Sequence, residues 1–295
     1  MVFPLHGNVY PSCRFFVTMN IGVPAKPYFL DIDTGSDLTW VDCGYDQGVG
    51  ENFQQTSKVN GILGLDRGKV SFVSQLKMLG IITNHVVGHC LSSRGGGFLF
   101  VGNDDGNMVP SSRVTWVPMS RSNSNTRNYY SPGSATLYFD RRSLGMNPMD
   151  VVFDSGSTCT YFTAEPYQAT VSAIKDGLSS SSLEQVSDPD LPLCWKGQKA
   201  FESVFDVKEE FKSLQLNFGN NAVMEIPPEN YLIVTENGNV CLGILHGSSE
   251  LNFNIIGDIT MQDQMVIYDN EREQLGWIRG SCGPGPTKSV MSFFP

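Results

Sequence analysis

Two short motifs of the same form each carry an aspartate, and they are the clearest candidates for chemistry in this 295-residue chain. The first motif is DTGS at residues 33–36, and the second, DSGS at residues 154–157, begins 121 residues later. If the fold brings Asp33 and Asp154 face to face, their like charges repel and the pair retains one proton. The ionised carboxylate can then take a proton from a water while the protonated one donates to a carbonyl oxygen. The motifs therefore predict one hydrolytic site built from two halves.

Each motif follows an apolar run that is typical of a buried strand, at residues 28–32 and 151–153. Both aspartates are therefore expected at strand-to-turn junctions. There Gly35 and Gly156 allow a tight turn, and the neighbouring hydroxyl groups can orient the carboxylates. Each half also has a downstream segment of two apolar residues and a glycine, at residues 62–64 and 255–257. This ordered repetition predicts two structurally equivalent halves.

With these paired motifs the chain resembles the pepsin-like aspartic proteases over nearly its whole length. Three stretches resemble the plant nucellin-like branch: residues 3–11 (FPLHGNVYP), 193–197 (LCWKG) and 254–269 (NIIGDITMQDQMVIYD). The resemblance implies an all-β, bilobal fold with a cleft between the lobes and a catalytic dyad of Asp33 and Asp154. It also implies that Thr34 and Ser155 bond across the lobes beneath the dyad, and that Ser36 and Ser157 bond the outer carboxylate oxygens. Together with the two glycines these are the six dyad-supporting residues: Thr34, Gly35, Ser36, Ser155, Gly156 and Ser157.

The resemblance implies an aspartic endopeptidase that hydrolyses polypeptides through the dyad and an activated water, without a cofactor. Its implied partners are an extended polypeptide substrate and pepstatin-type inhibitors, and it is expected to act as a monomer. The family usually enters the secretory pathway, so an extracellular or vacuolar location is expected, although residues 1–4 do not resemble a secretory signal. The alternative is a catalytically weak or silent binding or inhibitor protein of the same fold, because plant members include inhibitors of glycoside hydrolases.

The first half is much shorter than the second. Asp33 precedes Gly64 by 31 residues, whereas Asp154 precedes Gly257 by 103. In the family this interval of the first lobe carries a long hairpin, the flap, whose tyrosine covers the dyad. The sequence therefore predicts a truncated N-terminal lobe that lacks the flap, with the join near Asp42, and Tyr45 is not expected to be the flap tyrosine.

Composition is consistent with a folded protein of two lobes. Of the residues, 40% are apolar and 11% aromatic, and 30 Gly and 16 Pro separate many short apolar runs, which is typical of an all-β chain. A polar stretch at residues 120–128 indicates a boundary, so we expect an N-terminal lobe at 1–128 and a C-terminal lobe at 129–295. Helices are expected at residues 70–79 and 164–178.

The net charge of −10 argues against nucleic acid as a partner, because no basic stripe is present to neutralise phosphates. No segment is long and apolar enough to predict a membrane span. Neither the cysteine spacing nor the two histidines His85 and His89 predict a metal site.

Seven cysteines leave at least one without an intrachain partner. The resemblance implies a bridge between Cys194 and Cys241 and allows one between Cys43 and Cys90. Three cysteines are then left without a partner, as expected if a partner lay in the missing segment: Cys13, Cys159 and Cys282.

Overall fold

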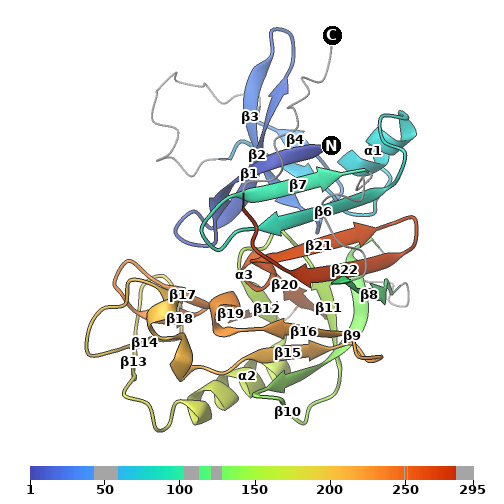
Figure 1. Ribbon diagram of the computed structural model, residues 1–295. Helices are drawn as coiled ribbons and strands as arrows, with labels where there is room; N and C mark the ends of the chain where they lie inside the picture. Colours follow the sequence, from blue (N-terminus) through green and yellow to red (C-terminus); the bar gives the residue numbers. More distant parts are fainter. Residues whose placement is uncertain (43–58, 103–112, 121–127, 249, 251, 284–295) are drawn as a thin grey trace.

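The computed structural model describes residues 1–42, 59–102, 113–120, 128–248, 250 and 252–283. Within these residues strands predominate, and they form an upper and a lower lobe with the hairpin β21–β22 between them (Figure 1). The prediction of an all-β, bilobal fold is therefore confirmed. Cys43 and Tyr45 lie outside the described residues, as does the segment that follows the expected join at Asp42.

The largest sheet of the described chain has ten strands in the order β4-β5-β3-β2-β1-β7-β6-β21-β22-β8. Most of its neighbours are antiparallel, but β3 and β5 run parallel. In chain order its strands are β1 Val2–Asn8, β2 Arg14–Ile21, β3 Lys26–Asp33, β4 Trp40–Val41, β5 Gly61–Gly64, β6 Val86–Leu91, β7 Gly97–Val101, β8 Thr115–Pro118, β21 Gln264–Asp269 and β22 Gln274–Arg279.

Two further sheets form the lower lobe. The larger has eight strands in the order β16-β15-β9-β11-β20-β12-β19, with β10 paired to β9, and the smaller has the order β13-β14-β18-β17. The strands of the larger sheet are β9 Tyr130–Phe139, β10 Arg142–Ser143, β11 Met149–Phe153, β12 Thr160–Phe162, β15 Leu214–Asn217, β16 Val223–Ile226, β19 Ile244–His246 and β20 Asn254–Ile256. Those of the smaller are β13 Glu184–Val186, β14 Cys194–Lys196, β17 Leu232–Val234 and β18 Val240–Leu242.

Both predicted helices are present. Helix α1 spans Phe72–Met78 and begins after Ser71, whose hydroxyl accepts the N–H of Ser74 as an N-cap. Helix α2 spans Ala164–Gly177 and turns a buried face that includes Ile174 toward the lower sheet. The remaining helical segments are short: α3 Asp258–Met261, η3 Val204–Asp206, η4 Lys208–Glu210 and η5 Pro228–Asn230.

One continuous cluster of buried apolar side chains runs through both lobes and includes Ile32 from β3 and Phe153 from β11. The expected division at residue 128 lies between β8 and β9 and stays a prediction. The hairpin β21–β22 comes late in the sequence but pairs with β6 on one side and β8 on the other, within the upper sheet. The chain's last described strands thus complete the upper sheet.

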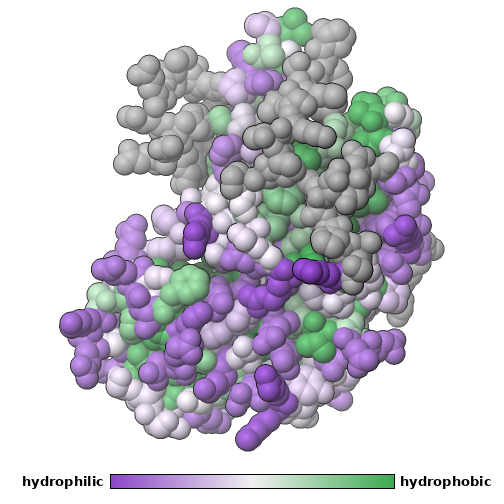
Figure 2. Space-filling model, in the orientation of Figure 1, coloured by the Kyte–Doolittle hydropathy of each residue, from purple (hydrophilic) through white to green (hydrophobic). Residues whose placement is uncertain are grey.

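Some apolar side chains remain at the surface beside α1. Figure 2 shows them as a green group at the upper right, where Figure 1 places this helix. They include Met78, which is 77% exposed, and Leu79, which is 65% exposed.

Candidate active site

Each aspartate of the two motifs lies at the end of a strand that pairs in parallel with another strand of its own half. β3 ends at Asp33, opposite Gly64 of β5. In the second half Phe153 of β11 is opposite Ile256 of β20, and the N–H of Asp154 donates to the Ile256 carbonyl at 3.0 Å. The downstream apolar-apolar-glycine segments therefore hold the two aspartates by strand pairing.

The turn after β3 holds the carboxylate of Asp33 on both oxygens. The N–H of Gly35 donates to Oδ1 at 2.8 Å, and the hydroxyl of Ser36 donates to Oδ2. Two donors on one carboxylate fix its plane, because each oxygen has a separate partner. The Asp33 side chain is thus oriented before any substrate arrives.

The turn after β11 repeats this arrangement around Asp154. Its Oδ1 accepts the N–H of Gly156 at 2.9 Å, and its Oδ2 accepts the hydroxyl of Ser157 at 2.9 Å. Burial, and then the charge of Asp33, raise the pKa of Asp154 to about 6, although the bonds from Ser157 and Gly156 act in the opposite direction. The pair therefore retains a proton well above the usual range for a carboxyl group.

The two turns are joined beneath the carboxylates by reciprocal hydrogen bonds. The Thr34 hydroxyl donates to the Phe153 carbonyl at 3.2 Å and accepts the Ser155 N–H at 2.9 Å. In return, the Ser155 hydroxyl donates to the Ile32 carbonyl at 2.8 Å and accepts the Thr34 N–H at 3.2 Å. Both hydroxyl residues are buried, so these four bonds connect the lobes in a region of low dielectric constant.

The glycines of the two motifs allow the carboxylates to approach each other. A Cβ atom added to Gly35 would lie 2.5 Å from Oδ1 of Asp154, and one added to Gly156 would lie 2.5 Å from Oδ1 of Asp33. Each glycine therefore packs against the carboxylate of the other half. The structure thus brings together all eight residues singled out in the sequence, while their part in catalysis stays a prediction.

Two further aspartates near the dyad were missed in the sequence. Asp31 lies two residues before Asp33 and on the same face of the strand. Burial raises the pKa of Asp31 to about 7; the charge of Arg14 lowers it, and the charges of Asp33 and Asp154 raise it further. Asp258 is 1% exposed, and its two carboxyl oxygens have no hydrogen-bond partner among the described residues. Burial, and then the charges of its acidic neighbours, raise its pKa well above the usual range. The sequence could have indicated both residues, because Asp31 lies two residues before Asp33 and Asp258 directly follows the apolar-apolar-glycine segment at residues 255–257.

The edge strand β4 of the ten-stranded sheet is short and follows the first aspartate loop in the sequence. β4 contains only Trp40 and Val41 and pairs with β5 through Trp40 and Ile62. Leu38 is 60% exposed and Trp40 is 48% exposed. Two large apolar side chains thus lie at the surface of this segment.

The cysteine predictions had two outcomes. The bridge between Cys194 and Cys241 is confirmed, and it joins β14 to β18. The suggested pair Cys43–Cys90 is wrong, because Cys90 is bonded to Cys282, 192 residues later. Cys90 lies on β6 opposite Met265 of β21, and the chain after β22 returns to the same apolar cluster. Cys282 is therefore not left without a partner, and no local sequence pattern indicates this return.

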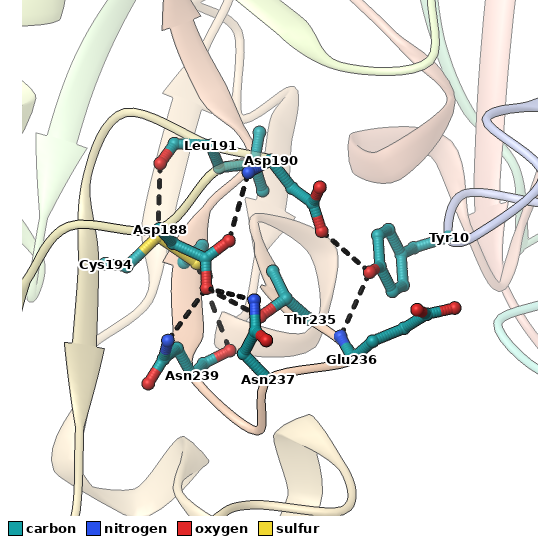
Figure 3. Close-up of a disulfide and its surroundings, with 10 residues drawn as sticks. Tyr10, Asp188, Asp190, Leu191, Cys194, Thr235, Glu236, Asn237 and Asn239 are labelled. Carbon is teal, nitrogen blue, oxygen red and sulfur yellow. Dashed lines mark hydrogen bonds between the residues drawn. A yellow bond between two sulfur atoms is a disulfide. The ribbon is translucent and has the colours of Figure 1, made fainter.

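Asp188 lies beside the Cys194–Cys241 bridge and resembles a metal ligand only by proximity. Its carboxyl oxygen and the two sulfur atoms lie within 4.8 Å of one another, but the sulfur atoms are bonded to each other and are not thiolates. Figure 3 shows instead that the carboxylate accepts bonds from Thr235 and Asn239. Burial alone would raise the pKa of Asp188, but these two bonds, together with those from the Asp190 N–H and from Asn237, lower it. Asp188 is thus a structural anchor for the loop at residues 235–239.

A contact between the lobes lies next to this anchor. Tyr10, from the upper lobe, donates its hydroxyl to the Asp190 carboxylate at 2.8 Å and accepts the N–H of Glu236 at 3.0 Å (Figure 3). The lobes are therefore joined at this surface as well as beneath the dyad.

Comparison with known proteins agrees with this fold. Residues 136–278 match a family model described as xylanase inhibitor C-terminal, and residues 15–57 and 45–103 match its N-terminal counterpart. The chain is 42% identical over 381 aligned positions to an aspartic proteinase of Oryza sativa subsp. japonica, covering 96% of this chain and 91% of the relative. It is 24% identical to the aspartic proteinase nepenthesin-1 of Nepenthes gracilis, covering 92% and 78%.

Solved structures show the same fold at low identity. The basic 7S globulin from soybean superposes with a TM-score of 0.75 at 14% identity, covering 96% of this chain and 95% of the globulin. The aspartic proteinase from Irpex lacteus superposes with a TM-score of 0.71 at 16% identity, covering 96% and 98%. Fold and site thus define a two-lobed protein with paired aspartate loops. The chain belongs to the pepsin-like aspartic protease family, in the group described by the xylanase-inhibitor models.

Among the described residues no helix is long and apolar enough to cross a membrane.

Proposed function

We propose that this protein is an aspartic endopeptidase that hydrolyses polypeptides through Asp33, Asp154 and a water held between them. The observation that carries the proposal is the packing of Gly35 and Gly156 against the opposite carboxylates, with both carboxylates held by paired donors. Such a pair can activate water and protonate a carbonyl oxygen without a metal or a covalent intermediate.

The chain's own residues would perform the reaction in two proton transfers. One carboxylate takes a proton from the water as its oxygen attacks the peptide carbonyl, and the other donates its proton to the carbonyl oxygen. The raised pKa of Asp154 supports retention of the single proton in weak acid. Thr34 and Ser155 would keep the two halves in register while the substrate binds, since their bonds cross directly beneath the carboxylates.

The test is proteolysis of a denatured globular substrate from pH 3 to pH 7, with and without pepstatin. Activity should be highest in acid, fall as pH rises through about 6, and disappear with pepstatin. Asp33→Asn and Asp154→Asn should each reduce the rate by several orders of magnitude. Asp176→Asn, at an exposed position of α2, is the matched control and should retain full activity. A near-normal rate in either dyad variant would overturn the proposal.

A weakly active or silent binding protein is the second candidate, and the short first lobe favours it. The alignment with the rice proteinase needs 381 positions, whereas this chain has 295 residues, and the N-terminal family model matches in two pieces. These facts, and the exposure of Leu38 and Trp40, support the loss of a covering hairpin. Without such a cover, water reaches the dyad and the peptide is less well positioned.

This second candidate makes a separate measurement decisive. We expect kcat/KM to be lower by about tenfold or more, and pepstatin binding weaker, than for a relative with an intact first lobe. Inserting the relative's missing segment after Asp42 should restore part of both. Equal kcat/KM in the two proteins would show that other residues cover the cleft.

The remaining properties follow from the same proposal. We propose an extended polypeptide as the substrate, pepstatin-type compounds as inhibitors and the monomer as the working form. Two disulfides and an acid-dependent dyad support a location in the secretory pathway, extracellular or vacuolar. Fractionation of plant cells that express a tagged full-length chain would test that location.

A further inference from the structure

Two cysteines of the described chain are not in a disulfide, and they come from opposite lobes. Cys13 lies in the turn between β1 and β2, directly before Arg14. Cys159 lies five residues after Asp154, at the end of the second aspartate loop and directly before β12. Neither residue belongs to the dyad or to its hydrogen-bonded neighbours.

The turn that carries Cys13 is docked onto the loop that carries Cys159. The hydroxyl of Thr158 donates to the carbonyl oxygen of Cys13 at 2.5 Å. With ordinary bond lengths, this bond brings the Cα atoms of Cys13 and Thr158 within about 7 Å. Cys159 is the next residue, so its Cα lies within about 11 Å of that of Cys13. A disulfide requires Cα atoms about 4.4–6.8 Å apart, so the turn that carries Cys13 has to move toward Cys159 by at most about 4–6 Å.

At this contact between the lobes Cys13 is exposed and Cys159 is buried. Burial, and then the charge of Cys13, raise the pKa of Cys159 to about 11. Burial, and then the charges of both thiolates, also raise the pKa of Tyr161. Cys13 itself has a φ of 55°, a left-handed conformation that residues other than glycine rarely adopt. The turn therefore holds a cysteine in an unfavourable conformation against the loop that carries the second free cysteine.

We propose that Cys13 and Cys159 form a third disulfide, which cross-links the upper lobe to the second aspartate loop. A small disulfide such as oxidised glutathione serves as the oxidant. The exposed Cys13 thiolate attacks one sulfur of glutathione disulfide, which forms a mixed disulfide and releases one glutathione thiolate. Cys159 then loses its proton and attacks the Cys13 sulfur, which forms the protein disulfide and releases the second glutathione.

The cross-link would fix the distance between the two halves beside the dyad. Its two ends lie 146 residues apart in the sequence, and one end is in the loop that positions Asp154. Closure of such a long chain segment restricts the unfolded state strongly. The bond would therefore add to the lobe contacts made by Thr34, Ser155 and Tyr10.

Disulfide mapping of the full-length chain tests the proposal directly. Protein equilibrated in a glutathione redox buffer is treated with iodoacetamide, digested without reduction and analysed by mass spectrometry. We expect the Cys13 peptide joined to the Cys159 peptide. The bridges Cys90–Cys282 and Cys194–Cys241 in the same digest show that the sample is correctly folded. Alkylation of both Cys13 and Cys159 in such a sample would overturn the proposal, and so would a bridge from either one to another cysteine.

A thiol count in a Cys43→Ser background gives an independent readout. That variant retains six cysteines, so we expect no free thiol after equilibration and denaturation. Cys13→Ser or Cys159→Ser in the same background should each yield one free thiol and a melting temperature lower by several degrees. Two free thiols in the Cys43→Ser parent would contradict the proposal, as would equal melting temperatures.

Discussion

Replacing Thr34 by valine tests the bonds that join the two aspartate loops. Valine has nearly the shape of threonine, so the substitution removes the hydroxyl and leaves the packing almost unchanged. The variant loses the bond to the Phe153 carbonyl and the bond from the Ser155 N–H. Thr34 is fully buried, so no water replaces the lost partner. The Ser155 N–H is thereby left without its acceptor inside the protein.

The expected cost follows from these contacts. A buried donor without a partner costs about 1–3 kcal/mol, and the lost bonds add about 1 kcal/mol, so Thr34→Val should reduce the free energy of unfolding by about 2–4 kcal/mol. Thr34→Ser is the matched control, because it keeps the hydroxyl and removes one buried methyl group. It should cost about 1 kcal/mol.

Urea unfolding at pH 5, followed by tryptophan fluorescence, measures both variants. The pair Thr34 and Ser155 also allows a double-mutant cycle with Ser155→Ala, which removes the reciprocal bonds. Because the two residues bond each other, the double variant should lose less stability than the sum of the single variants, with a coupling of about 0.5–3 kcal/mol. A Thr34→Val protein within about 0.5 kcal/mol of Thr34→Ser, a margin set by the usual error of additivity, would refute the reasoning.

Three further substitutions have defined outcomes. Asp258 has a raised pKa in the folded state, so its contribution to stability is present below about pH 4 and is lost as pH rises toward that pKa. Above about pH 4 the Asp258→Asn variant should therefore gain stability relative to the parent, by up to about 1.4 kcal/mol per pH unit. Urea unfolding midpoints from pH 3 to 7 measure this gain, and a stability difference that does not change with pH would contradict the prediction. Gly156→Ala places a Cβ 2.5 Å from Oδ1 of Asp33 and should lower kcat/KM about 100-fold while urea unfolding changes little; unchanged kinetics would refute the close packing. Cys282→Ser removes the disulfide to Cys90, which spans 192 residues, and should lower the free energy of unfolding in urea by about 3–5 kcal/mol. Cys43→Ser is the control and should leave the free energy of unfolding unchanged.

The sequence was most informative where local rules and the fold agree. The apolar runs before Asp33 and Asp154 predicted strands that lead to the aspartates, and β3 ends at Asp33 while β11 ends at Phe153, directly before Asp154. The repeated apolar-apolar-glycine segments predicted equivalent halves, and β5 and β20 pair in parallel with these strands. Both signals are short-range patterns of alternation and turn formation, which the surrounding fold reinforces.

Contacts between distant residues could not be read in this way. Nothing in the sequence indicates that β21 and β22 enter the upper sheet between β6 and β8, because strand pairing at this separation depends on the completed fold. The pairing of Cys90 with Cys282 depends on that placement, so the simpler pairing with Cys43 was wrong. Spacing alone leaves many cysteine pairings open.

The pKa values of the carboxyl groups near the dyad could not be predicted from the sequence either. Asp31 could have been placed beside Asp33 by strand alternation, but its raised pKa follows from burial and from charges that belong to both lobes. Asp258 reaches this group only because β20 and α3 thread beside the second aspartate loop. Their raised pKa values make these two groups contribute less to the stability of the folded protein as pH rises from about 4 to 7, the same interval in which Asp154 loses its proton. At Asp31 and Asp258, acid conditions thus favour the folded state as well as the protonated dyad, which links the contribution of these two groups to the pH at which the proposed chemistry can operate.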